Sequence, residues 1–160
     1  MNPTSLLNDE IDRGLQSIGK IDATVQEFQN EVLVVSGRTK MTAMIAAQLL
    51  ENFYTCLETI FLRISQFFEN NLPPDSWHAA LLDRMVLHVS GIRDAAIRDE
   101  TRILLDELRR FRHFKRYYFE LDYDWARLDY LLDVYRRALP LVRIDLDNFK
   151  AFLKALGSDS

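Results

Sequence analysis

The sequence predicts an all-α protein, folded as an antiparallel up-and-down bundle of about five helices. Apolar residues recur at steps of three and four along every long segment, and no segment alternates apolar and polar residues as a strand does. Only 5 Gly and 4 Pro occur in 160 residues, which favours a few long elements over many short ones. We expect one domain over residues 1–160, with its core from about residue 5 to residue 155.

Two long helices are predicted in the first half of the chain. The first spans residues 5–35 and ends at Ser36-Gly37, since Gly commonly ends a helix in a left-handed conformation. The second spans residues 40–70 and ends at the run 70–74, which closes with Pro73-Pro74. The two apolar stripes comprise Leu6, Leu7, Ile11, Leu15, Ile18, Ile21, Val25, Phe28 and Val32, and then Met44, Ile45, Leu49, Phe53, Cys56, Leu57, Ile60, Ile64 and Phe67.

Two shorter helices follow in the predicted order. One runs from Trp77 to about His88, with Asp75-Ser76 as its N-cap and Ser90-Gly91 at its end. The other spans about residues 100–118 and has Asp99 as its predicted cap. The expected core face of this second helix comprises Leu104, Leu108, Phe111 and Tyr118.

The last helical region begins near Trp125, after a polar and aromatic bend at residues 120–124. An apolar stripe continues through Leu139 and on to Leu153, with Pro140 between them. Proline lacks a backbone donor and its ring clashes with the preceding turn, so Pro140 should break or kink this helix.

Composition limits the compartments and chemistries that fit the chain. The single Cys56 cannot form an intramolecular disulfide, no signal peptide opens the sequence, and no apolar run approaches the roughly 18 residues of a membrane span. We therefore expect a soluble, cytoplasmic protein with no membrane partner. The sequence has no glycine-rich phosphate loop, no zinc-type cysteine pair and no metal-ligand spacing, so we expect neither a metal nor another cofactor. His78 and His88 are interpreted as surface or packing residues.

One stretch, Leu108–Phe119, stands out by its charge and its aromatic content. It holds five of the 20 Lys and Arg residues within eight positions and without an acid, while the whole chain has a net charge of −4. The remaining 15 basic and 24 acidic residues balance to −9, an asymmetry typical of a partner-binding segment. The five basic residues are Arg109, Arg110, Arg112, Lys115 and Arg116.

Helical periodicity groups the functional side chains of this stretch. At about 100° per residue, Arg109, Arg112, His113, Arg116 and Tyr117 fall within one face roughly 140° wide. Guanidinium groups suit phosphate oxygens, and an imidazole titrates near neutrality as proton transfer requires. The predicted phosphate-binding or RNA-binding residues are thus Arg109, Arg112 and Arg116, and the predicted catalytic residues are Arg112, His113 and Tyr117. A solvated charged face, paired with nearby acids, is the alternative interpretation.

The same stretch resembles the HEPN superfamily, specifically its HepT-like branch. The resemblance rests on Leu105–Phe114 followed by the bend Asp122–Trp125, on Asn52–Glu58 in the second predicted helix, and on Leu72-Pro73 and Trp77-His78. It covers roughly residues 5–155. The motif of the family is Arg, four residues, His, one residue and Tyr. In this chain Arg112 occupies the Arg position, whereas Tyr117 and Phe119 stand at the His and Tyr positions.

The resemblance implies a helical bundle that forms a homodimer, with two motif helices at a shared cleft. Many HEPN proteins are metal-independent ribonucleases, and HepT types are commonly the toxin of a toxin–antitoxin pair with a minimal nucleotidyltransferase as partner. Two functions therefore remain open for this chain. The first is a toxin-type protein that cleaves RNA, with Arg112 on the phosphate and His113 as a replacement acid or base. The second is a catalytically degenerate binding protein that holds a nucleotidyltransferase or RNA.

Overall fold

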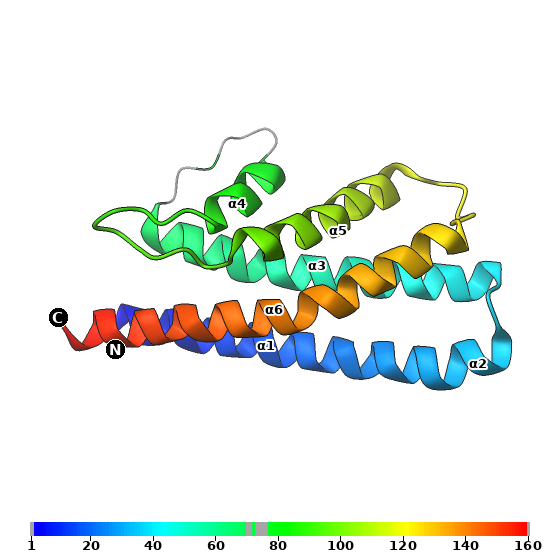
Figure 1. The fold of residues 1–160 in the computed structure, drawn as a ribbon, viewed down its shortest axis with the longest axis horizontal. Helices are drawn as coiled ribbons and strands as arrows, with labels where there is room; N and C mark the ends of the chain where they lie inside the picture. Colours follow the sequence, from blue (N-terminus) through cyan, green and yellow to red (C-terminus); the bar gives the residue numbers. More distant parts are fainter. Residues whose placement is uncertain (1, 70–71, 73–76, 160) are drawn as a thin grey trace.

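The computed structural model describes residues 2–69, 72 and 77–159, and it confirms the all-α prediction. The long first helix consists of α1 (Pro3–Glu27), the π-helical turn η1 (Phe28–Val32) and α2 (Leu33–Ser36). It is followed by α3 (Lys40–Phe68), α4 (Trp77–Met85), α5 (Asp99–Tyr117) and α6 (Trp125–Ser158). Successive long helices run in opposite directions, and the two termini lie at the same end of the bundle (Figure 1). Among the described residues the helices are accompanied by no named strand, only by an isolated bridge between Val89 and Arg93.

Local sequence signals account for most helix ends. The Asn2 side chain accepts a hydrogen bond from the Thr4 backbone N–H at 3.1 Å, with Pro3 as the first helical residue. Thr39 and Thr42 form a reciprocal capping box at the start of α3. Gly37 has φ of +71°, so the predicted stop at Ser36-Gly37 is confirmed.

The ends of α4 and α5 differ from the predictions. Asp99 is the first residue of α5 rather than its cap, because Arg98 holds the cap position and donates its backbone N–H to Asp145 at 3.1 Å. The helix α4 ends at Met85, whose carbonyl oxygen accepts hydrogen bonds from the backbone N–H groups of Ala96 and Ile97. The predicted cap Asp75-Ser76 and the run 70–74, apart from Leu72, lie outside the described residues.

Pro140 does not interrupt α6, which continues from Trp125 to Ser158. The helix changes direction partway along its length instead (Figure 1). A proline removes one backbone hydrogen bond, and its ring clashes with the preceding turn. Because the helix packs against the bundle before and after Pro140, it bends at this point and does not break. The flanking residues Leu139 and Val142 are buried in the bundle.

One hydrophobic core joins the long helices. On α5 the buried apolar residues are Leu105, Leu108 and Phe111, whereas the predicted core residue Leu104 is only partly buried. Because Leu105 is buried and Leu104 is not, the buried face of α5 includes Arg112. No helix in the described part of the chain is both long enough and apolar enough to cross a membrane.

The packing of α1 on α3 depends on a close approach at Gly14. A Cβ atom at this position would lie 2.5 Å from Cγ1 and Cδ1 of Ile60, whereas a Cβ at Gly19 would meet nothing within 4 Å. We expect Gly14→Ala to lower the free energy of unfolding by about 1–3 kcal/mol through overpacking. Gly19→Ala should raise it by up to about 1 kcal/mol through helix propensity.

Urea denaturation measures both changes. Adding Ile60→Val to Gly14→Ala removes the Cδ1 atom and should recover part of the loss. Equal stabilities of the two glycine variants would show that the two helices do not pack at this distance in solution.

Candidate functional site: a buried arginine network

The side chain of Arg112 points into the bundle and is only 3% exposed. Its Nη2 donates to Oε2 of Glu58 at 2.8 Å, and its Nη1 donates to Oγ1 of Thr55 at 3.3 Å. The Glu58 side chain is 8% exposed, so both charges of this pair between α3 and α5 are withdrawn from water. A buried pair is tolerated only when each charge is compensated by close, hydrogen-bonded partners.

Tyr54 closes the pocket around this guanidinium. The Cζ atom of Arg112 lies 4.8 Å from the centre of the Tyr54 ring, at a distance suited to a cation–π contact. Burial, and secondly the negative charge of Glu58, raises the pKa of Tyr54 far above its ordinary value. The phenol is therefore neutral at every physiological pH and is a packing partner of Arg112.

His78 of α4 completes the network. Its Nδ1 lies 2.8 Å from Oε2 of Glu58 and 3.1 Å from Nη2 of Arg112. Nδ1 can form only one of these hydrogen bonds at a time: it donates to the Glu58 carboxylate when it carries the ring proton, and it accepts from Nη2 of Arg112 when it does not. The His78 side chain keeps 31% of its surface exposed, and its ring stacks on Trp77 with 3.7 Å between the centres. The Arg112–Glu58–His78 network thus connects three helices to an imidazole at the surface.

The other predicted catalytic residues lie outside this network. His113 is exposed, and the centre of its ring is 5.0 Å from that of Tyr117, which is 69% exposed. The structure therefore brings His113 and Tyr117 together on the surface, while the adjacent Arg112 is turned inward. The residues expected on a single face of α5 are therefore divided between the core and the surface. Arg112 turns inward because Glu58 of α3 is its buried partner, and a helical wheel of α5 alone does not contain Glu58.

Most positive charges of the stretch are paired with acids. Arg109 and Arg110 both contact the Asp106 carboxylate at 2.9 Å. Lys115 contacts Glu51 of α3 at 2.6 Å. Arg116 is exposed and forms no ion pair among the described residues. Of the predicted phosphate-binding residues, Arg116 is thus the one whose charge is open to solvent, Arg109 is half-buried, and Arg112 is enclosed.

Sequence reasoning passed over Glu58 and treated His78 as a surface or packing residue. The available signal was positional: Glu58 closes the segment Asn52–Glu58, and His78 belongs to Trp77-His78, both of which carry the family resemblance. The physical link between them, a shared contact with one guanidinium, depends on how α3, α4 and α5 pack.

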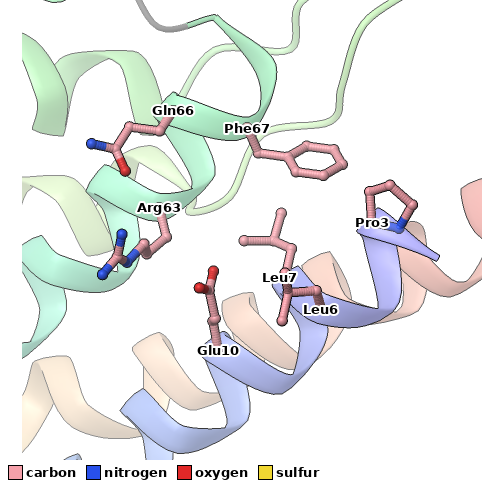
Figure 2. Close-up of a pocket in the computed structure, with 7 residues that line it drawn as sticks. All are labelled: Pro3, Leu6, Leu7, Glu10, Arg63, Gln66 and Phe67. Carbon is pink, nitrogen blue, oxygen red and sulfur yellow. The ribbon is translucent and has the colours of Figure 1, made fainter. Parts of the chain in front are cut away.

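Five hollows on the described part of the chain are lined by residues other than Arg112, Glu58 and His78. One of about 270 Å³ lies between α1 and α3, with Pro3, Leu6 and Phe67 at one end and Glu10 and Arg63 at the other (Figure 2). Within the described residues no group of three or more His, Cys, Asp and Glu side chains is arranged to hold a metal ion.

The fold and the site define an antiparallel helical protein with a buried arginine–glutamate pair that anchors a histidine. The family model described as "HepT-like protein" matches residues 45–153, a range that contains the whole network. The chain belongs to this HepT-like family of the HEPN superfamily. Neither a curated protein nor a solved structure matches the chain.

The Arg112–Glu58 pair should dominate the stability of the site. Arg112→Met leaves a buried carboxylate without its counter-charge, so we expect a loss of about 3–5 kcal/mol in the free energy of unfolding. Adding Glu58→Leu removes that carboxylate and should restore much of the loss. Chemical denaturation of the single and double variants measures this coupling.

Arg110→Met is the matched control, because the Arg110 side chain is 71% exposed. Its effect should stay within about 0.5 kcal/mol. A cost for Arg112→Met no greater than that of the control would contradict a buried ion pair.

Proposed function

We propose that the protein is the toxin-type component of a toxin–antitoxin pair and acts on RNA by metal-independent cleavage. The observation that carries the proposal is the Arg112–Glu58–His78 network, in which a buried carboxylate holds Nδ1 of a partly exposed imidazole. A carboxylate that orients a histidine is the usual preparation for general acid–base catalysis. Membership of the HepT-like family supports the toxin-type role.

RNA carries its own nucleophile for this reaction. A base removes the proton of a 2′-hydroxyl, the 2′-oxygen attacks the adjacent phosphorus, and the bond to the 5′-oxygen breaks as an acid protonates that oxygen. The products are a 2′,3′-cyclic phosphate and a free 5′-hydroxyl. His78 takes one of the two proton-transfer roles through Nε2.

The other proposed site residues bind the phosphate or position the catalytic groups. Arg116, which has no ion pair among the described residues, and Arg109 attract the phosphate, and the Tyr117 hydroxyl donates a hydrogen bond to it. Arg112 acts through Glu58 and His78, as the group that positions them. The protein forms a homodimer, and a minimal nucleotidyltransferase is the proposed antitoxin.

A second function, a catalytically degenerate protein that binds RNA or a nucleotidyltransferase without cleavage, is favoured by a different observation. Four of the five basic residues of the stretch already have acidic partners, and Tyr117 and Phe119 stand at the motif positions for His and Tyr. Such pairing weakens the field available to stabilise a developing negative charge. Cleavage assays separate the two functions directly.

RNA cleavage by the purified protein in the presence of a metal chelator tests the first proposal. We expect His78→Asn to reduce the rate at least a hundredfold, because one general acid or base contributes about 10²–10⁴. Arg112→Lys should also impair cleavage, since an ammonium cannot reproduce the planar fork that joins Glu58 and Thr55.

His88→Asn serves as the matched control, because His88 is 67% exposed and its ion pair is with Asp94 rather than Glu58. It should leave the rate unchanged. Circular dichroism confirms folding of each variant. Binding of RNA without any cleavage by the parent protein would replace the first function by the second.

The homodimer should use the exposed aromatic end of α5. Phe119 is 83% and Tyr117 is 69% exposed, and exposed aromatic rings close together are typical of protein interfaces. Sedimentation at micromolar concentration should show a dimer, and Phe119→Asp should shift it toward the monomer by adding a charge to the interface. Val35→Asp, at a similarly exposed position within α2, is the control and should keep the dimer. A parent protein that sediments only as a monomer would contradict the proposed interface.

A further inference from the structure

A groove lined by aromatic rings and arginines lies between the C-terminal half of α5 and the start of α6. It consists of two hollows, of about 290 and 340 Å³, which share Phe111, Phe114 and Arg127 in their walls. Arg110 lines one hollow, and Tyr118 and Tyr123 line the other. These six residues define the aromatic groove. Its size is at the lower end of the range for small-molecule sites, about 300 Å³.

Phe114 is the ring of the groove that is most exposed to solvent. Phe111 and Tyr123 are buried, with 6.1 Å between their centres, and form part of the core beneath. Phe114 is 47% exposed and stacks on Tyr118 at 4.8 Å with an angle of 25° between the planes. A flat group placed against Phe114 would extend a stack that the protein has already begun, in the offset geometry that aromatic pairs prefer.

Positive charge lies beside this stack. Arg127 is exposed and has no ion pair within the described residues, and its Cζ lies 5.6 Å from the centre of the Tyr130 ring. Arg110 is also exposed, although it shares Asp106 with Arg109. An aromatic platform beside guanidinium groups is the combination that proteins use for single-stranded nucleic acid, in which a base stacks and the phosphate meets a cation.

Acidic groups limit how such a ligand can lie. Asp122 and Asp124 line the second hollow, where Asp124 caps α6 through the Ala126 N–H and the Asp122 carbonyl oxygen accepts from the Tyr118 hydroxyl. Two carboxylates would repel a phosphate at that end. They can accept hydrogen bonds from base N–H groups, so the base belongs at this end and the phosphates belong toward Arg110 and Arg127.

We propose that the aromatic groove binds one unpaired base of single-stranded RNA, stacked on Phe114, with the adjoining phosphate on Arg127. The groove is distinct from the Arg112–Glu58–His78 network, because Arg112 is enclosed by residues of α3 and α4 whereas the groove lies against α6. This inference rests on the proposed function in taking RNA as the ligand, but it does not require cleavage. In this proposal the groove binds a nucleotide that lies away from the bond that is cleaved.

The experiment uses a six-nucleotide RNA that contains one 2-aminopurine, a base analogue whose fluorescence is quenched by stacking. Deoxyribose throughout the backbone of a second version removes the 2′-hydroxyl nucleophiles, so that binding is measured without cleavage. The parent protein should quench the probe. Phe114→Leu should remove most of the quenching and weaken binding by about tenfold, as expected for the loss of one base stack.

Two matched variants separate stacking from charge. Phe114→Tyr keeps the ring and should retain the quenching. Arg127→Gln should weaken binding and lower the slope of its salt dependence by about one, while the bound probe remains quenched.

Each alternative outcome is distinct. RNA cleavage by the parent protein together with unchanged quenching in Phe114→Leu overturns the groove assignment and leaves the proposed function standing. Quenching that depends on Phe114 in a protein that cuts no RNA supports the groove and overturns cleavage. Absence of probe binding overturns the groove assignment. Conversion of a dimer to a monomer by Phe114→Leu, with quenching unchanged, would make the groove a protein interface.

Discussion

The ion pair between Glu58 and Arg112 is the interaction on which the site depends. Both side chains are withdrawn from water, so neither charge can be left without the other. The pair therefore fixes α3 and α5 in register, and the hydroxyl of Thr55 and the ring of Tyr54 complete the surroundings of the guanidinium. A purely apolar contact would hold the two helices together without specifying which side chain reaches which, whereas this pair requires one alignment.

A second buried arginine that pairs with a glutamate positions the short helix α4. The buried Arg93 donates from Nε to Oε1 of Glu69 at 2.7 Å, and from Nη2 to the Arg84 carbonyl oxygen at 2.8 Å. This arginine joins the ends of α3 and α4 to the connection that leads into α5. With α4 held in this way, His78 reaches Glu58, and a surface imidazole is linked to a buried charge.

Charge is distributed so that the basic stretch serves two purposes. Its inward and lateral cations stabilise the packing of α5 on α3 through Glu51 and Glu58. Arg116 on α5 and Arg127 on α6 have no ion pair in the described part of the chain, and Cζ of Arg127 lies 5.6 Å from the centre of the Tyr130 ring. The positive field offered to a polyanion is therefore much smaller than the sequence count implies, and it is concentrated at the end of α5.

The sequence by itself determined the helices and their order, because the apolar steps, Ser36-Gly37 and the cap at Thr39 act within one or two turns of the chain. It also indicated which segment is the candidate functional one, since the clustering of basic residues and the resemblance are linear features. Tertiary structure decided which way each side chain of that segment points. Arg112 is buried because a glutamate 54 residues earlier faces it across the bundle, and no periodicity within α5 contains that information. For the same reason the sequence does not show that His78 contacts Glu58, because this contact depends on how α4 packs against α3.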